Sequence, residues 1–166
     1  QIIEFESSRP ELQHHLRTVL QSELLKSIQS NRQPFNQITA KQRAFFEQDI
    51  RVAFDDYLKQ RIGVYSGRVE SDESNPKLAS LFVIGANGDM LSIAYDEPVR
   101  TQSVGRNYSF RTYFHGQGQD LNRDTKPQSV APIQNTHLSA AFQSTTTKRW
   151  KIAISTPVYA NDEKTN

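Results

Sequence analysis

Apolar residues recur at helical spacing through the first third of the chain. Ser8-Arg-Pro-Glu11 has the serine, early proline and glutamate of a capped helix start. Thr39-Ala-Lys-Gln42 forms a second capping box, and Gly63 is expected to end the helix that follows. The apolar positions of the two stripes are Leu12, Leu16, Val19, Leu20, Leu24 and Ile28, then Phe46, Ile50, Phe54, Tyr57 and Leu58. Two long amphipathic helices are therefore predicted within residues 1–62.

The pattern changes to that of strands in residues 78–159. Two short apolar runs, 78–84 and 90–95, flank the turn sequence Gly85-Ala-Asn-Gly88 and predict a β-hairpin. Residues 136–144 and 149–159 are further strand candidates. In the last of these, three large apolar residues alternate with smaller or polar ones, which predicts a strand with one apolar face and one wetter face. The apolar set is Trp150, Ile152 and Ile154, and the other set is Lys151, Ala153 and Ser155.

Helices first and strands afterwards indicate an α+β fold with an antiparallel sheet, because no alternating βαβ pattern demands parallel strands. The 166 residues fit a single domain, with a helical part at 1–62 and a sheet part at 78–159. The long helices are expected to cover one face of a central sheet. The other face is left to loops and a short helical segment near Phe110, and a ligand pocket is expected there.

Composition narrows the classes of function. A formal net charge of +2 offers no broad basic surface, so nucleic acid is not an expected partner. The chain has no cysteine, which excludes disulfides and thiolate metal sites. No signal peptide or transmembrane segment is visible in the sequence.

Catalytic and metal motifs with the right spacing are absent from the sequence. There is no nucleophile elbow, phosphate loop or zinc-protease motif. His14 and His15 are adjacent on a predicted helix and cannot share a metal, so they are interpreted as surface residues. Asp55-Asp56 and Asp72-Glu73 lack the alternating oxygen donors of a calcium loop and are interpreted as solvated charge. We expect neither an enzyme nor a cofactor or metal.

The segment Gly105-Arg-Asn-Tyr-Ser-Phe-Arg-Thr-Tyr-Phe114 concentrates arginines and aromatic rings. Arginine offers a planar fork of donors that matches a carboxylate, and tyrosine adds a ring and a hydroxyl. The segment and its neighbour supply the candidate binding residues Arg106, Tyr108, Arg111, Tyr113 and His115. The alternative is a surface helix whose rings cap the core and whose arginines pair with acids.

This segment, followed by His137-Leu-Ser-Ala-Ala-Phe-Gln-Ser144 and Trp150-Lys-Ile-Ala-Ile-Ser-Thr-Pro-Val158, resembles the Cache family of extracytoplasmic sensor domains. The resemblance spans about residues 78–158. It implies a PAS-like fold with a long N-terminal helix, a central antiparallel sheet and a pocket roofed by the arginine segment. It also implies a place outside the cytoplasmic membrane, between flanking transmembrane helices, with control of a cytoplasmic kinase, cyclase or chemotaxis module.

The resemblance assigns ligand contacts residue by residue. Arg111 matches the family's carboxylate-binding arginine and Tyr113 its neighbouring aromatic residue. Tyr108, His137 and Ser139 lie on segments that line the pocket in similar domains. Amino-acid-binding members place an aspartate after the Pro-Val pair, where this chain has Ala160, with Asp162 close by. A plain carboxylate or other small anion is therefore favoured over an amino acid.

The sequence thus predicts a sensor that binds a small organic acid or amino acid and works as a dimer through its opening helix. One alternative is a protein-interaction or structural domain without a small-molecule ligand. Another is a small lyase or isomerase, for which His115 and His137 are the candidate acid–base residues.

Overall fold

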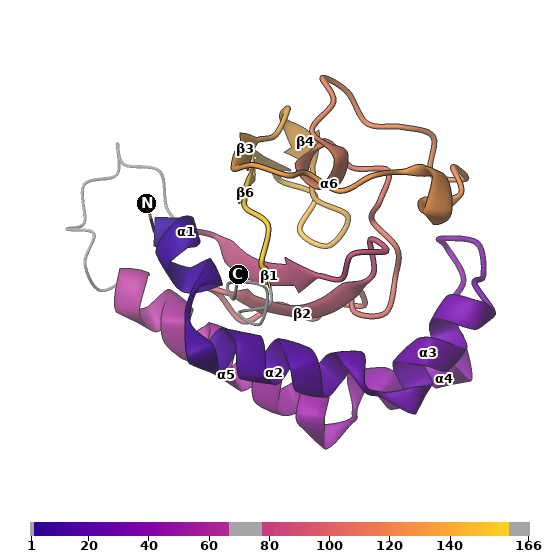
Figure 1. Ribbon diagram of the computed structural model, residues 1–166, viewed down its shortest axis with the longest axis horizontal. Helices are drawn as coiled ribbons and strands as arrows, with labels where there is room; N and C mark the ends of the chain where they lie inside the picture. The colour runs from indigo at the N-terminus through magenta and orange to yellow at the C-terminus, as the bar shows by residue number, and fades with distance from the viewer. Residues whose placement is uncertain (1, 67–77, 160–166) are drawn as a thin grey trace, which may run out of the picture.

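A computed structural model describes residues 2–66 and 78–159, and shows helices on one side of a β-hairpin and short strands with long loops on the other (Figure 1). The predicted loop with Asp72 and Glu73, and the positions Ala160 and Asp162, lie outside these residues. In the described part, the helices that precede the strands are α1 (Ile2–Ser7), α2 (Pro10–Leu20), α3 (Glu23–Ser30), α4 (Ala40–Phe46) and α5 (Asp49–Ser66). They are followed by β1 (Ser80–Ile84), β2 (Met90–Tyr95), α6 (Thr112–His115), a 3-10 turn (Pro127–Ser129), β3 (His137–Leu138), β4 (Phe142–Gln143), β5 (Trp150–Lys151) and β6 (Ile154–Ser155). The predicted α+β class is confirmed.

The predicted first helix is two helices. Pro10 does open α2, but Ser8 does not cap it, because its hydroxyl donates to the carbonyl of Phe5 at the end of α1. A second N-cap breaks the helix at Ser22, whose hydroxyl accepts from the backbone N–H of Leu25 at 3.3 Å. The apolar spacing runs unchanged across this break, so periodicity alone did not reveal it.

The second helical segment is also divided, although its predicted start is correct. Thr39 and Gln42 form the capping box, with bonds of 3.1 Å and 2.8 Å between side chain and backbone. Gly63 does not end the helix, because α5 continues to Ser66. Ile62 precedes Gly63 and Tyr65 follows it, and both side chains are buried. Their packing offsets the roughly 1 kcal/mol that a glycine costs within a helix.

The hairpin of β1 and β2 is confirmed and forms the centre of the molecule. Its turn depends on Gly88, which has a φ of +85° and lies so close to Ser109 that an added Cβ would be 2.6 Å from the serine Cβ. α5 packs on β2, and α2 packs on α5. The carboxylate of Asp55 joins the two layers by accepting from the Ser92 hydroxyl at 2.6 Å and the Ile93 N–H at 3.2 Å. Asp55 is thus a structural residue rather than the solvated charge predicted from the sequence.

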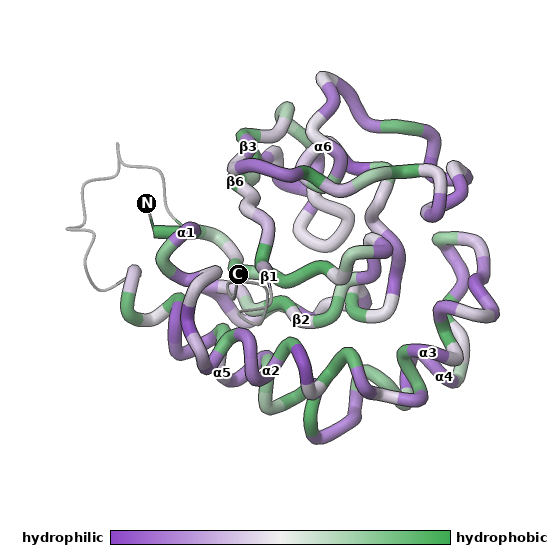
Figure 2. Tube along the Cα trace, viewed as in Figure 1, coloured by the Kyte–Doolittle hydropathy of each residue, from purple (hydrophilic) through white to green (hydrophobic). Residues whose placement is uncertain are grey.

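The core lies between the hairpin and the helices. Phe45, Phe54, Leu58, Val19 and Leu91 are fully buried there. Hydrophobic residues recur along the helices and the hairpin in Figure 2, as the amphipathic pattern requires. None of the helices in residues 2–66 and 78–159 has the length and apolarity needed to cross a bilayer.

The C-terminal strands differ from the prediction in extent and in orientation. β3 pairs with β6 and β4 with β5, two residues each, so the described residues form three two-stranded antiparallel sheets instead of one central sheet. The face predicted to be apolar and covered points to solvent. Its members Trp150, Ile152 and Ile154 are between 58% and 73% exposed, and Leu138, opposite Ile154 in β3, is 59% exposed. We call these four residues the exposed strand face. Ala153, which belongs to the opposite set of alternating residues, is buried instead. The segment therefore packs on the rest of the domain through the face predicted to be wetter.

Candidate functional site

A small cavity lies between the hairpin and the C-terminal segments, on the face of the hairpin away from the helices. Side chains at alternate positions of each strand reach it, Ser80 and Phe82 from β1 and Ile93 and Tyr95 from β2. β4 and β5 supply Phe142 and Lys151 from the opposite side, with Ser144, Thr145 and Thr146 in their connecting turn. The remaining wall consists of Met90, Ser103, Tyr108, Arg111 and Tyr113.

The cavity has a volume of about 40 Å³. One water molecule needs roughly 10–15 Å³ of such space, so the cavity holds a few waters or a ligand of similar size. Its lining combines aromatic rings, eight hydroxyl groups and two cationic side chains. This mixture suits a small polar ligand that carries a negative charge.

Arg111 lies in the wall of the cavity, and both terminal nitrogens of its guanidinium donate hydrogen bonds within the domain. Nη1 donates to Oδ2 of Asp120 at 2.6 Å, and Nη2 donates to the carbonyl of Gln143 at 3.1 Å. The guanidinium lies between the rings of Phe110 and Phe142, at 5.1 Å and 5.0 Å. Nε is buried and has no partner in the described residues. Arg111 therefore joins the 110–120 segment to β4, and its Nε–H is not used.

The two predicted tyrosines also line the cavity. Tyr113 contacts Phe82 and Phe142 through its ring, at centroid distances of 5.3 Å and 5.2 Å. Burial raises its pKa well above the ordinary value of 10, so the phenol is neutral. The Tyr108 hydroxyl lies 3.3 Å from that of Thr145 and ties the β4–β5 turn to the arginine segment.

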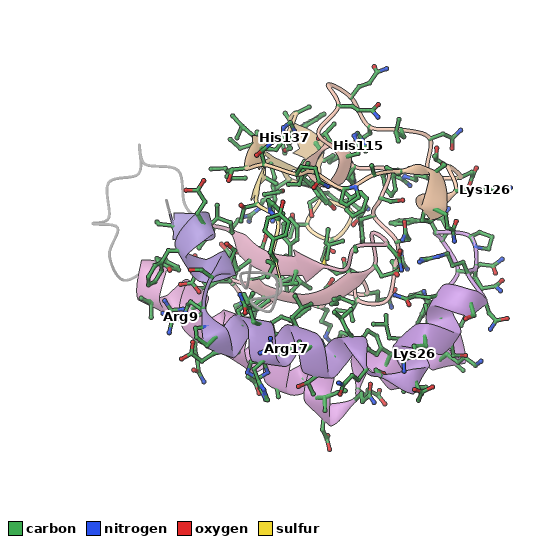
Figure 3. The ribbon with its side chains drawn as sticks, viewed as in Figure 1. Arg9, Arg17, Lys26, His115, Lys126 and His137 are labelled. Carbon is green, nitrogen blue, oxygen red and sulfur yellow. The ribbon has the colours of Figure 1, made fainter. Side chains whose placement is uncertain are left out.

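The other four predicted site residues do not line the cavity. Arg106 lies over the ring of Phe35 at 5.2 Å. The Ser139 hydroxyl accepts from the N–H of Ala153 and donates to the carbonyl of Ala140, so it joins the end of β3 to the residues between β5 and β6. His115 and His137 lie in the C-terminal layer near α6 and β3 (Figure 3).

The two histidines have no acid–base partner in the described residues. In His115, Nδ1 accepts from the N–H of Gln117 and Nε2 lies 3.0 Å from the carbonyl of Phe110. Both ring nitrogens thus hold the local backbone, with the proton on Nε2. Nε2 of His137 is buried and has no partner among the described residues. Within residues 2–66 and 78–159 no three histidine, aspartate or glutamate side chains gather as a metal site.

Sequence reasoning missed Lys151, Tyr95 and Asp120. Lys151 is opposite Phe142 in the β4–β5 register, and its Nζ lies over the ring of Tyr95 at 5.4 Å. The alternation around Trp150 signals that Lys151 points away from the tryptophan. The sequence does not tell which of the two faces meets the domain.

A second cavity, of about 290 Å³, lies among α3, the 31–39 loop and α4. Its polar groups are satisfied locally. Lys41 donates to the Ser27 hydroxyl, Asn31 to the Ser27 carbonyl, and Thr39 and Gln42 cap α4. The smaller cavity beneath Arg111 is the better candidate, because polar groups there remain without partners in the described chain. No protein-family model, curated protein or solved structure matches this chain.

Proposed function

We propose that this chain is the extracytoplasmic ligand-sensing domain of a membrane signalling receptor, with the PAS-like fold of the Cache family, and that it binds a small carboxylate. The cavity between the hairpin and the arginine segment carries this proposal. Two cationic side chains, Arg111 and Lys151, give it a positive potential, while Asp120 is the acidic side chain that binds Arg111. The order of elements, with helices on one face of a hairpin and the cavity on the other, supports the proposal.

Binding would act on the loops that close the cavity. The wall residues come from the hairpin, the arginine segment and the β4–β5 turn, which are far apart in sequence. A ligand that prefers one arrangement of these segments shifts the domain toward it. The helices on the other side of the hairpin would carry this shift to a cytoplasmic module, and α2 would pair with a second copy in a homodimer.

The direct test is isothermal titration calorimetry of the chain with small organic acids, amino acids and their uncharged amides. We expect binding of at least one acid and much weaker binding of its amide. Arg111→Gln removes the charge and opens the bridge from Asp120 to Gln143. Arg111 holds β4 through this bridge and adds positive charge to the cavity wall, so affinity should fall by more than about tenfold.

Asp120→Asn is the matched control, because it keeps the size of the side chain and removes the negative charge that pairs with Arg111. We expect this variant to bind the acid at least as well as the original chain. Absence of binding by every acid and amide would overturn the sensing proposal. Unchanged affinity of Arg111→Gln would overturn the role of Arg111.

The second candidate function is that of a protein-interaction domain, and the exposed strand face favours it. A set of large apolar side chains exposed along neighbouring strands often marks a contact with another molecule. Sedimentation velocity of the chain and of Trp150→Ser measures whether this face joins two copies. A concentration-dependent dimer that Trp150→Ser abolishes would favour this function.

A further inference from the structure

The charged group that faces the cavity without a partner is Lys151. Arg111 donates through both terminal nitrogens to Asp120 and Gln143. The backbone of Lys151 pairs with Phe142 in the β4–β5 ladder, but its side chain forms neither a hydrogen bond nor an ion pair with any residue of the described chain. It is half-buried, and its Nζ lies over the ring of Tyr95. An acid entering the cavity would have to displace Asp120 to bind both ends of the Arg111 fork, but could bind Lys151 without displacing any group.

Hydroxyl groups next to Lys151 are also without partners. Ser80 and Tyr95 are opposite each other at the open end of the hairpin, and Lys151 approaches the same tyrosine from β5. Neither of these hydroxyls, nor that of Tyr113, hydrogen-bonds another residue in the ranges the structure describes. Ser103 and Thr146 differ, since their hydroxyls lie 3.1 Å apart and satisfy each other. The unpaired groups therefore gather on the Lys151 side of the cavity.

The environment of Lys151 is typical of a binding lysine. Burial, and then the positive charge of Arg149, lower its pKa from the ordinary value of 10.5, while Glu97 raises it. An ammonium that is partly removed from water gains more from an incoming carboxylate than an exposed one does. Phe142 and Tyr95 supply the apolar and aromatic sides of this subsite.

We propose that Lys151 is the residue that binds the ligand's carboxylate, and that the ligand is a short hydroxy or keto acid whose oxygen reaches Ser80 and Tyr95. The inference rests on the proposed ligand-sensing function and makes it more specific. The cavity volume of about 40 Å³ limits the acid to a few non-hydrogen atoms. Arg111 then acts as a positioning residue that holds β4 in place for Lys151.

Calorimetry with lactate, pyruvate and acetate, and with lactamide as the uncharged counterpart of lactate, tests this assignment. Lys151→Met keeps the length of the side chain and removes the charge. We expect it to weaken lactate or pyruvate binding by about tenfold or more and to leave lactamide binding unchanged. Lys59→Met removes the same charge from an exposed position on α5 and should bind as the original chain does.

The possible results distinguish a failure of the Lys151 assignment from a failure of the sensing function. If the original chain binds none of these acids, this ligand class is wrong, and the wider panel of acids and amino acids then decides whether sensing itself fails. If it binds them and Lys151→Met binds equally well, the Lys151 assignment fails and sensing stands. An NMR titration of the Lys151 side chain provides a readout that does not depend on a variant. Saturating acid should raise the pKa of Lys151, and an unchanged pKa would overturn the contact.

Discussion

The helical layer buries its large apolar residues, whereas the C-terminal strands expose theirs. On the helical side, Phe45, Phe54 and Leu58 are fully buried against the hairpin. On the other side, Trp150, Ile152 and Ile154 face solvent, although they alternate as the apolar positions of a half-buried strand do. The helical side is built for stability. The C-terminal side leaves large apolar groups exposed and has polar groups without partners in the described chain at a cavity.

Ionic groups show the same contrast. Glu6 is buried with Arg61 and Tyr65, and Asp89 is buried with Arg32, Gln29 and Asn107. These carboxylates have several partners each. The ammonium of Lys151, in the C-terminal part, lies over the ring of Tyr95 and has no hydrogen-bond or ion-pair partner among the described residues. In the proposed function, the ligand binds on the side where a charge lacks such partners.

The largest loss in the free energy of unfolding is expected from a substitution in the helical layer. Phe54→Ala removes a fully buried ring that packs near His15 and Tyr57. Such a cavity costs about 3–5 kcal/mol. Urea denaturation measures this loss, and Phe54→Leu should recover much of it. A loss below about 1 kcal/mol would show that the helices contribute little to holding the hairpin.

The next largest loss of stability is expected when Glu6 is replaced, and this loss depends on pH. Burial raises the pKa of Glu6, but the hydrogen bonds from Arg61 and Tyr65 and the charge of Arg61 outweigh burial, so the pKa lies below the ordinary value of 4.5. The folded state therefore binds its proton less readily than the unfolded state does. This stabilisation is present above pH 4.5 and is lost as the pH falls through the lower folded pKa.

Glu6→Gln should cost about 1–3 kcal/mol at neutral pH and less in acid. Thermal unfolding of both proteins across this range measures the difference. Glu23→Gln, which changes an exposed pair with Lys26, is the control and should cost about 0–1 kcal/mol. A deficit for Glu6→Gln that stays constant with pH would contradict the ionic role of Glu6.

The smallest change in the free energy of unfolding is expected from a substitution on the exposed strand face. Ile152→Ser should change the free energy of unfolding by no more than about 0.5 kcal/mol, since Ile152 is 63% exposed. Ile62→Ser, the same substitution at a residue 2% exposed, should be severely destabilising. Equal losses at the two positions would show that the C-terminal face is covered in solution and would remove the contrast between the two sides.

Local chemistry made part of the fold predictable from the sequence. The capping box of Thr39 and Gln42 and the positive φ of Gly88 in the hairpin turn are local features, and both elements are as predicted. Apolar periodicity located most of the helical residues and the hairpin. The breaks at Ser22 and before α5 could not be predicted in this way, because a capped break leaves the spacing of apolar residues almost unchanged.

The candidate site was predictable where it is continuous in sequence. Tyr108, Arg111 and Tyr113 share one segment and all line the cavity. Lys151, Tyr95 and Asp120 are distant in sequence, and no local pattern links them to Arg111.

The sequence by itself determined the α+β order of elements, the hairpin and the crowding of arginines and rings, because these follow from spacing and from residue type. Only the tertiary structure decided that Asp120 and Gln143 occupy the Arg111 fork, that Lys151 faces the cavity, and that Trp150 and Ile152 face solvent. Alternation along a strand defines two faces. Which face is covered depends on what packs against it, and that is set by contacts between segments far apart in the chain.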